Sequence, residues 1–193
     1  SQDLRKWEKK GIIFREQNKD AVLFPEKING FYVALNRPEV FYEFHRPAIW
    51  ISYSPDLVYW GREKSLMMPR EKSWECGRIG AGAPPIKTAK GWLLIYHGVD
   101  DRSKSNIYNA GAVLLDLNNP EKILARSRIR KPLLSPQQKY EQEGFMSNVV
   151  FPTGVVMDLN GKDLLIYCGG ADRIVSVKKI ALKDILRSLE YYS

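Results

Sequence analysis

The chain has few cysteines and no long apolar run, and each shortage excludes a class of protein. Only two cysteines, Cys76 and Cys168, occur among 193 residues. This excludes a disulfide-dense secreted scaffold and favours a reducing, cytoplasmic compartment, with a single Cys76–Cys168 bridge as the less favoured alternative. No Cys/His cluster has the spacing of zinc ligands, so no metal is expected. No apolar run approaches the roughly 18 residues that cross a bilayer, and no signal-like segment follows Ser1, so no membrane partner is expected.

The composition is that of a folded domain with a surplus of positive charge. Hydrophobic residues make up 44% of the chain, which excludes disorder, and the formal net charge is +8. That charge raises nucleic-acid binding as a hypothesis. The basic residues are scattered, however, and we interpret the densest segment, residues 126–131, as a solvated loop. No nucleic-acid partner is therefore expected, whereas a subset of cations that converges on an anionic substrate stays open.

An internal repeat of about sixty residues organises the chain. Residues 1–7 match residues 54–60 at four of seven positions, and the aspartates of the copies, Asp3, Asp56, Asp116 and Asp184, are spaced 53, 60 and 68 residues apart. Between these markers, three apolar segments (31–37, 92–98 and 164–170) each follow a turn signal. Each is followed by another strand-like segment (49–53, 111–115 and 174–177). This alternation predicts an all-β class built from propeller blades.

The end of the chain is the one segment with a helical period. Leu182, Ile185, Leu186 and Leu189 fall at i, i+3, i+4 and i+7, which predicts a short C-terminal helix over residues 182–191. Only about three repeat units and a stub are present, whereas propellers usually close with about four to eight blades. We therefore expect residues 1–193 to form a single partial β-propeller domain whose N-terminal blade or blades lie outside this sequence.

Polar residues occupy equivalent strand ends in successive repeats, where a propeller would bring them together around its channel. These ends carry Asn36 with Arg37, then His97, then Cys168 with Asp172. Further polar residues precede apolar strands: Lys19 and Asp20, and Arg78. Lys19, Arg37, Arg78 and His97 together would supply the cations and donors that hold phosphate. Taken singly, each is better explained as a surface or fold-stabilising group, and that alternative stays open.

Seven collinear segments run along almost the whole chain, at residues 18–25, 35–38, 49–56, 79–86, 91–98, 148–154 and 167–172. In order and spacing they resemble the β-mannoside phosphorylases and related β-mannosidases of glycoside hydrolase family 130. The resemblance implies a five-bladed β-propeller, of which this sequence would hold about three blades and a stub. It also implies an inverting phosphorylase that cleaves β-mannosides with inorganic phosphate to give α-mannose 1-phosphate, with phosphate as co-substrate and no cofactor.

The resemblance also implies residue roles. Phosphate-binding positions fall on Lys19, Arg37, Arg78 and His97, with Asp20 beside them, and sugar-contacting positions fall on Tyr108, Asn148 and Asp172. Arg78 stands where a lysine is common, Ser147 replaces a proline and Asn109 replaces an arginine, so no acceptor sugar is implied. The family's general acid is an aspartate in a Glu-Asp-Pro-Arg-like segment. That segment is absent here and expected upstream of Ser1, so no catalytic residue is assigned.

Two alternatives remain at this point. A β-mannoside hydrolase of the same family is disfavoured because hydrolysis does not need the basic set that phosphate needs. A non-catalytic glycan-binding remnant is motivated by the missing acid. The expected partners are a β-mannoside oligosaccharide and phosphate, and self-association into a homo-oligomer stays open.

Overall fold

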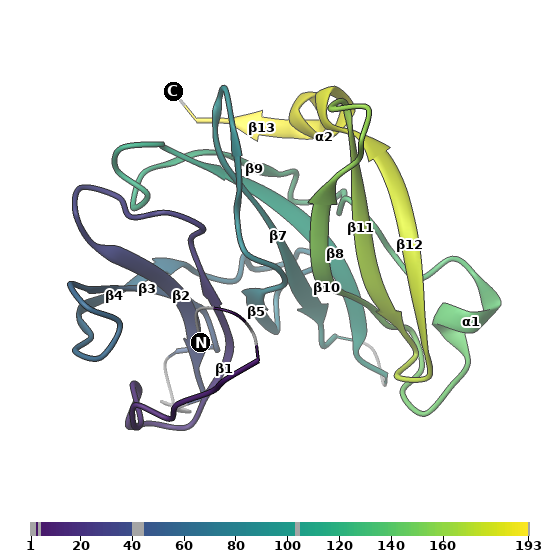
Figure 1. Cartoon of the computed structure of the whole chain (residues 1–193). Helices are drawn as coiled ribbons and strands as arrows, with labels where there is room; N and C mark the ends of the chain where they lie inside the picture. Colours follow the sequence, from purple (N-terminus) through teal and green to yellow (C-terminus); the bar gives the residue numbers. More distant parts are fainter. Residues whose placement is uncertain (1–2, 4, 40–44, 103–104, 193) are drawn as a thin grey trace.

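The protein is built mainly of β-strands in three antiparallel sheets. The structure, a computed structural model, describes residues 3, 5–39, 45–102 and 105–192. The sheets follow one another in chain order across the molecule (Figure 1). Among the described residues, helix is limited to α1 (Lys139–Gln142) and α2 (Leu182–Ser188). The predicted all-β class is confirmed.

The first sheet is a four-stranded meander. It contains β1 (Asn18–Leu23), β2 (Tyr32–Pro38), β3 (Ile49–Ser54) and β4 (Gly61–Met67), in that spatial order. Beyond β1, the chain reverses at Asn29 and Gly30, which lie between the bridged residues Ile28 and Phe31. Both turn residues have positive φ, 51° and 85°, as a tight two-residue β-turn of this kind requires. The turn expected from Asn29-Gly30 is therefore present.

The second sheet lies at the centre of the molecule. It contains β5 (Arg78–Ala81), β6 (Ile86–Thr88), β7 (Gly91–Asp100), β8 (Ile107–Leu115), β9 (Ile123–Ser127) and β13 (Leu189–Tyr191). The prediction of a helix over residues 182–191 is correct only as far as Ser188. From Leu189 onward the chain is the strand β13, because its backbone pairs with β9 and the Leu189 side chain is buried in the core. The pairing covers an edge that β9 would otherwise expose.

Strand β7 joins the two hydrophobic cores of the protein. Its side chains alternate between faces: Trp92, Leu94 and Tyr96 belong to the core shared with the first sheet. Leu93 and Ile95 belong to the core shared with the third sheet. The third sheet contains β10 (Val150–Met157), β11 (Asp163–Gly170) and β12 (Ile174–Ala181). Sheets stacked on both faces of a central sheet are consistent with successive blades.

Three of the repeated aspartates make the same backbone contacts. The Oδ1 atoms of Asp3, Asp56 and Asp116 each accept hydrogen bonds from the amides two and three residues later, at 2.8–3.0 Å. The aspartate that marks the sequence repeat therefore stabilises the same turn each time. Asp184 is different, because it lies in the first turn of α2. Its interpretation as a fourth copy of this turn is wrong.

The basic segment 126–131 is only partly a solvated loop. Arg126 is buried in β9, where its Nη2 lies 2.8 Å from Glu75 Oε1 and its Nε donates to the Tyr96 hydroxyl at 3.2 Å. Glu75 is itself fully buried and also pairs with Arg70 at 2.5 Å. Paired carboxylate and guanidinium groups make such burial tolerable. The solvated-loop interpretation is therefore wrong for Arg126 and Ser127 and correct for the exposed residues 128–131.

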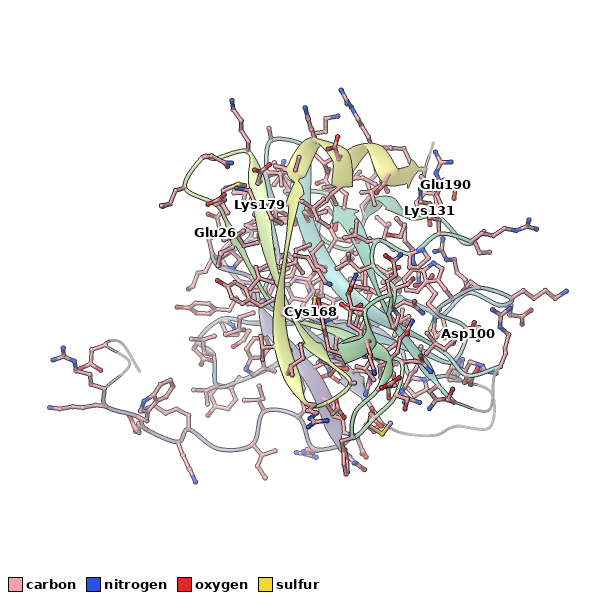
Figure 2. The ribbon with its side chains drawn as sticks, turned by 90° about the vertical axis from the view of Figure 1, so that its right-hand side faces the viewer. Glu26, Asp100, Lys131, Cys168, Lys179 and Glu190 are labelled. Carbon is pink, nitrogen blue, oxygen red and sulfur yellow. The ribbon has the colours of Figure 1, made fainter. Side chains whose placement is uncertain are left out.

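The two cysteines are free and buried, so the alternative of a Cys76–Cys168 disulfide is excluded. Cys168 lies among the strands of the third sheet (Figure 2). Within the described part of the chain, no helix has the length and apolar character needed to cross a membrane.

Gly111 tests how tightly the central sheet packs. A Cβ at this position would lie 2.5 Å from Trp74 Cη2 and 2.8 Å from Tyr96 Cζ. We expect Gly111→Ala to lower the free energy of unfolding by about 1–3 kcal/mol through overpacking, seen as a drop of several degrees in Tm. The matched control is Gly154→Ala in β10, where the nearest atom would be 3.7 Å away. Equal Tm values for the two variants would contradict the packing described here.

Candidate functional site

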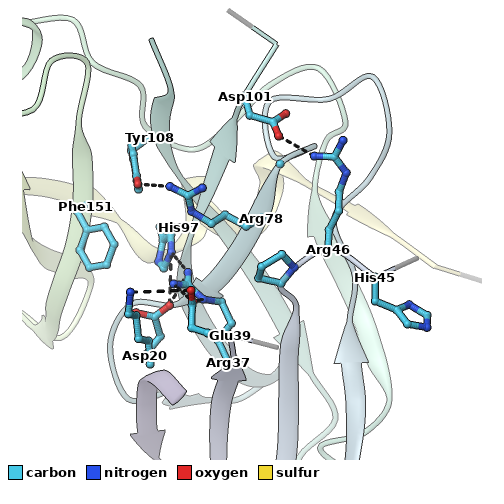
Figure 3. Close-up of a pocket in the computed structure, with 13 residues that line it drawn as sticks. Asp20, Arg37, Glu39, His45, Arg46, Arg78, His97, Asp101, Tyr108 and Phe151 are labelled. Carbon is cyan, nitrogen blue, oxygen red and sulfur yellow. Dashed lines mark hydrogen bonds and ion pairs between the residues drawn. The ribbon is translucent and has the colours of Figure 1, made fainter. Parts of the chain in front are cut away.

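A cavity of about 1040 Å³ lies where strands of all three sheets converge. Strands β1, β2, β5, β7, β8 and β10 contribute to it, and Figure 3 shows their side chains directed toward one another. The residues that line it are Lys19, Asp20, Arg37, Glu39, His45, Arg46, Pro47, Gly77, Arg78, His97, Asp101, Tyr108 and Phe151. Six of the eight residues expected at a phosphate and sugar site are therefore brought together.

Arg37 is the hub of the charged groups in this cavity. Its side chain is only 6% exposed, and its Nη1 lies 2.7 Å from Asp20 Oδ2 and 2.9 Å from His97 Nε2. On the other edge of the guanidinium, Nε and Nη2 lie 2.8 and 2.6 Å from Glu39 Oε1. A buried charge is tolerated only when it is paired and hydrogen-bonded. The position of this cation is thus fixed from two sides.

Asp20 reaches Arg37 because the backbone of β1 is irregular. The pairing register of β1 with β2 shifts between Lys19 and Val22, and Asp20 has a φ of 54°. Such a bulge changes the direction of a side chain relative to the regular strand. Room for the carboxylate comes from Gly80 of β5, where a Cβ would overlap the Asp20 carboxylate and lie 2.5 Å from His97 Cε1. A side chain at position 80 would therefore disrupt the site.

His97 is neutral in this setting. It is 1% exposed, and burial together with the charges of Arg37 and Arg78 lowers its pKa to about 3. Because Arg37 Nη1 is a donor, His97 Nε2 accepts the hydrogen bond and the ring proton is assigned to Nδ1. The 3.6 Å approach of Nε2 to Asp20 is therefore not an ion pair. For Asp20, burial raises the pKa of the carboxyl group, against the opposing effect of Arg37.

Arg78 carries the charge that the cavity leaves unbalanced. Its Nη2 donates to the Tyr108 hydroxyl, and its guanidinium carbon lies 5.3 Å from the centre of that ring. Among the described residues, no carboxylate oxygen lies within 4 Å of it, whereas Arg46 lies 2.7 Å from Asp101 Oδ2. The lining residues include four Lys or Arg side chains and three carboxylates, and these seven groups sum to a charge of +1. The arrangement favours an anionic ligand beside Arg78.

Sequence reasoning missed five of the polar or aromatic lining residues: Glu39, His45, Arg46, Asp101 and Phe151. Phe151 packs 4.4 Å from His97 and 6.4 Å from Tyr108, between ring centres, and forms an apolar wall. It lies within the segment 148–154 that resembles the mannoside enzymes, so that segment was a signal that could have found it. For the other four, the sequence offers no pattern. Arg46 and Asp101, for example, meet across 55 residues, which only the folded chain brings about.

Asn148 and Asp172 are not among the residues that line the cavity. The carbonyl of Asn148 accepts from the Tyr108 amide at 2.9 Å, which places its backbone against the cavity wall. Asp172 is exposed in the turn between β11 and β12. Their sugar-contacting roles remain predictions. Cys168 belongs to the core between the second and third sheets, so its placement at a channel is wrong. The described residues contain no group of three or more ligands that could hold a metal ion.

Comparisons with known proteins match the chain along almost its whole length. The family model of glycoside hydrolase family 130, described as beta-1,4-mannooligosaccharide phosphorylase, matches residues 2–191. The 1,2-beta-oligomannan phosphorylase of Thermoanaerobacter sp. (strain X514) is 45% identical over 185 residues, 96% of this chain and 58% of that protein. The solved structure of beta-1,2-mannobiose phosphorylase from Listeria innocua, in complex with beta-1,2-mannobiose, superposes with a TM-score of 0.89 at 40% identity. The match covers 97% of this chain and 51% of that one. The chain thus spans just over half the length of these relatives.

The neutral state of His97 makes stability depend on pH. Its pKa is about 3 in the folded protein and about 6.5 in an unfolded chain, so the unfolded chain binds more protons between these values. The free energy of unfolding therefore falls as the pH is lowered below about 6.5. Between pH 7 and pH 5, His97 contributes a loss of about 2 kcal/mol. We expect His97→Gln to lack this loss in urea denaturation, whereas His45→Gln, at the exposed second histidine, should retain it. Parallel pH profiles for both variants would contradict a neutral His97.

Arg78 and Arg46 form a matched pair for testing anion binding. Both line the cavity, but only Arg46 is balanced by a carboxylate. We expect Arg78→Met to weaken phosphate binding by about tenfold to hundredfold, in line with a charge-assisted contact worth about 1.5–3 kcal/mol. Arg46→Met should weaken it by less than about threefold. Isothermal titration calorimetry with inorganic phosphate measures both, and a larger loss in Arg46→Met would overturn this charge assignment.

Proposed function

The chain belongs to glycoside hydrolase family 130, and on that premise we propose that it is part of an inverting β-mannoside phosphorylase. In this proposal, inorganic phosphate cleaves the β-mannosidic bond and α-mannose 1-phosphate is released. The observation that carries the proposal is a cavity in which Arg37 is fixed and the guanidinium of Arg78 lacks a carboxylate partner among the described residues. A hydrolase uses water in place of phosphate, so it would have no anionic co-substrate for these cations to bind. The names of the relatives at 40–45% identity support the same reaction class.

The cavity residues would act on phosphate before and during its attack. A phosphate oxygen forms a bond to the anomeric carbon as the bond from that carbon to the leaving oxygen breaks, which inverts the configuration. Arg37, Arg78 and Lys19 would hold the anion in position, and their charge would keep it ionised. His97 is neutral and accepts a hydrogen bond from Arg37 Nη1, so it would help to hold Arg37 in place and would add no charge of its own.

The leaving oxygen needs a proton, and no described residue is assigned to supply it. In an inverting reaction, the nucleophile and the general acid act on opposite faces of the sugar ring. Asp20 lies 2.7 Å from Arg37, so in this proposal it would be on the phosphate side of the sugar and not on the side of the acid. We propose that an aspartate outside residues 1–193 fulfils this role. If no such acid existed, the alternative would hold: the protein would be a glycan-binding remnant without turnover.

The remaining features of the proposal concern substrate and context. The substrate class is a β-mannoside oligosaccharide, with a β-1,2 linkage as the first choice because three relatives at 40–45% identity carry that linkage in their names. Phosphate is the co-substrate, and no further cofactor is proposed. The three sheets would be three blades of a five-bladed propeller, with residues 1–193 forming one part of that domain. Two buried, free thiols favour a reducing, cytoplasmic location.

The test is phosphorolysis by the intact protein. Incubated with β-1,2-mannobiose, it should release α-mannose 1-phosphate only when inorganic phosphate is present, as measured by anion-exchange chromatography. Arg37→Ala should raise KM for phosphate at least tenfold and change KM for the mannoside far less. Release of free mannose without phosphate would replace the proposal with a hydrolase. Binding of mannobiose without any product would support the glycan-binding remnant.

A further inference from the structure

We propose that Glu39 is a positioning residue of the phosphate site, which holds Arg37 and Lys19 in the places from which they meet the anion. The inference rests on the proposed function, because it assigns these cations to phosphate. Glu39 carries a carboxylate, which repels phosphate, so it is not itself one of the groups that donate hydrogen bonds to the anion. Its role would be exerted entirely through the two cations.

Glu39 contacts a different cation with each of its carboxylate oxygens. Its Oε1 lies 2.8 Å from Arg37 Nε and 2.6 Å from Arg37 Nη2, while its Oε2 lies 3.9 Å from Lys19 Nζ. The Glu39 side chain is 17% exposed, against 54% for Lys19. The carboxylate of Glu39 thus links two cations on neighbouring strands, the buried Arg37 of β2 and the solvent-exposed Lys19 of β1.

The backbone of Glu39 is itself anchored. Its amide donates to the Gln17 carbonyl at 2.8 Å, just beyond the pairing of Asn18 with Pro38. The neighbouring Arg37 amide donates to Asn18 Oδ1 at 3.1 Å. Two ties to the start of β1 therefore fix the chain on either side of Pro38. A side chain that grows from an anchored backbone can hold its partner with little loss of freedom on ligand binding.

Glu39 and the pair of Asp20 and His97 hold opposite edges of one planar group. An arginine side chain has five N–H donors in a fixed fork. Nε and Nη2 face Glu39, and Nη1 faces Asp20 and His97. Without Glu39, the guanidinium could turn about the contacts at Nη1. Loss of that orientation would weaken a phosphate contact that depends on geometry.

The charge of Glu39 acts in the opposite direction, because a carboxylate repels phosphate. Two substitutions separate the effects. Glu39→Gln removes the charge but keeps an oxygen that can accept from Arg37. Glu39→Ala removes both the charge and the acceptor. Glu26→Ala is the matched control, since Glu26 is exposed, pairs only with Lys87 among the described residues and lies outside the cavity.

Calorimetric binding of inorganic phosphate to the intact protein, combined with steady-state kinetics on β-1,2-mannobiose, tests the inference. For Glu39→Ala we expect Kd and KM for phosphate to rise about tenfold, equivalent to about 1.4 kcal/mol, with KM for mannobiose within about twofold. Glu39→Gln should stay within about threefold of the parent, and Glu26→Ala should match it.

Three results would overturn the inference. Tighter phosphate binding in both Glu39 variants would mean that the charge alone matters. A parallel loss of kcat, of affinity for both substrates and of Tm would mean a purely structural role, and unchanged phosphate affinity in Glu39→Ala would mean no role. The proposed function fails separately, when the parent protein turns over mannobiose without phosphate. A parent that binds no phosphate overturns both.

Discussion

The site depends on burying one positive charge, that of Arg37, in the place where the sheets meet. A buried arginine needs paired and hydrogen-bonded partners. The chain supplies them from β1, from β7 and from the residue after β2: Asp20, His97 and Glu39. Several unusual local features serve this requirement. Asp20 adopts a positive φ in a bulge, and position 80 is a glycine because any side chain there would overlap Asp20 and His97. The result is a fixed cation, Arg37, beside Arg78. Among the described residues, no carboxylate balances the charge of Arg78.

The sheets make this convergence possible. Strand β7 sends Trp92, Leu94 and Tyr96 into one core and Leu93 and Ile95 into the other, so the second sheet is held between its neighbours. Near the end of the same strand, His97 stands beside Arg37 of the first sheet and Phe151 of the third. The packing that stabilises the fold therefore also fixes the spacing of the site. Polar groups from distant parts of the sequence, such as Asp20 and His97, are therefore held directly by strands that pack in the core.

Much of this could be predicted from the sequence, and the failures have physical causes. Strands and turns leave local patterns, such as Asn29-Gly30 before an apolar run, and the repeated aspartates cap the same turn in three copies. Positions at strand ends pointed to Lys19, Asp20, Arg37, Arg78 and His97, and the resemblance to the family added Tyr108. All six line the cavity. Glu39, Arg46 and Asp101 leave no pattern, because their contacts, such as that of Arg46 with Asp101 55 residues away, exist only in the folded chain. Arg126 was misjudged for the same reason: its partner Glu75 is 51 residues away in the sequence, and only the fold makes it a core residue. Leu189 continued a helical period, but the open edge of β9 turned that segment into a strand.

We infer that Arg37, which carboxylates hold, and Arg78, which has no carboxylate partner among the described residues, together form a phosphate site. The most direct measurement is a crystal structure of the intact protein grown with inorganic phosphate. We predict a phosphate ion within hydrogen-bond distance of both Arg37 and Arg78, with Glu39 and Asp20 still in contact with Arg37. Phosphate bound elsewhere, with this cavity free of any anion, would contradict it.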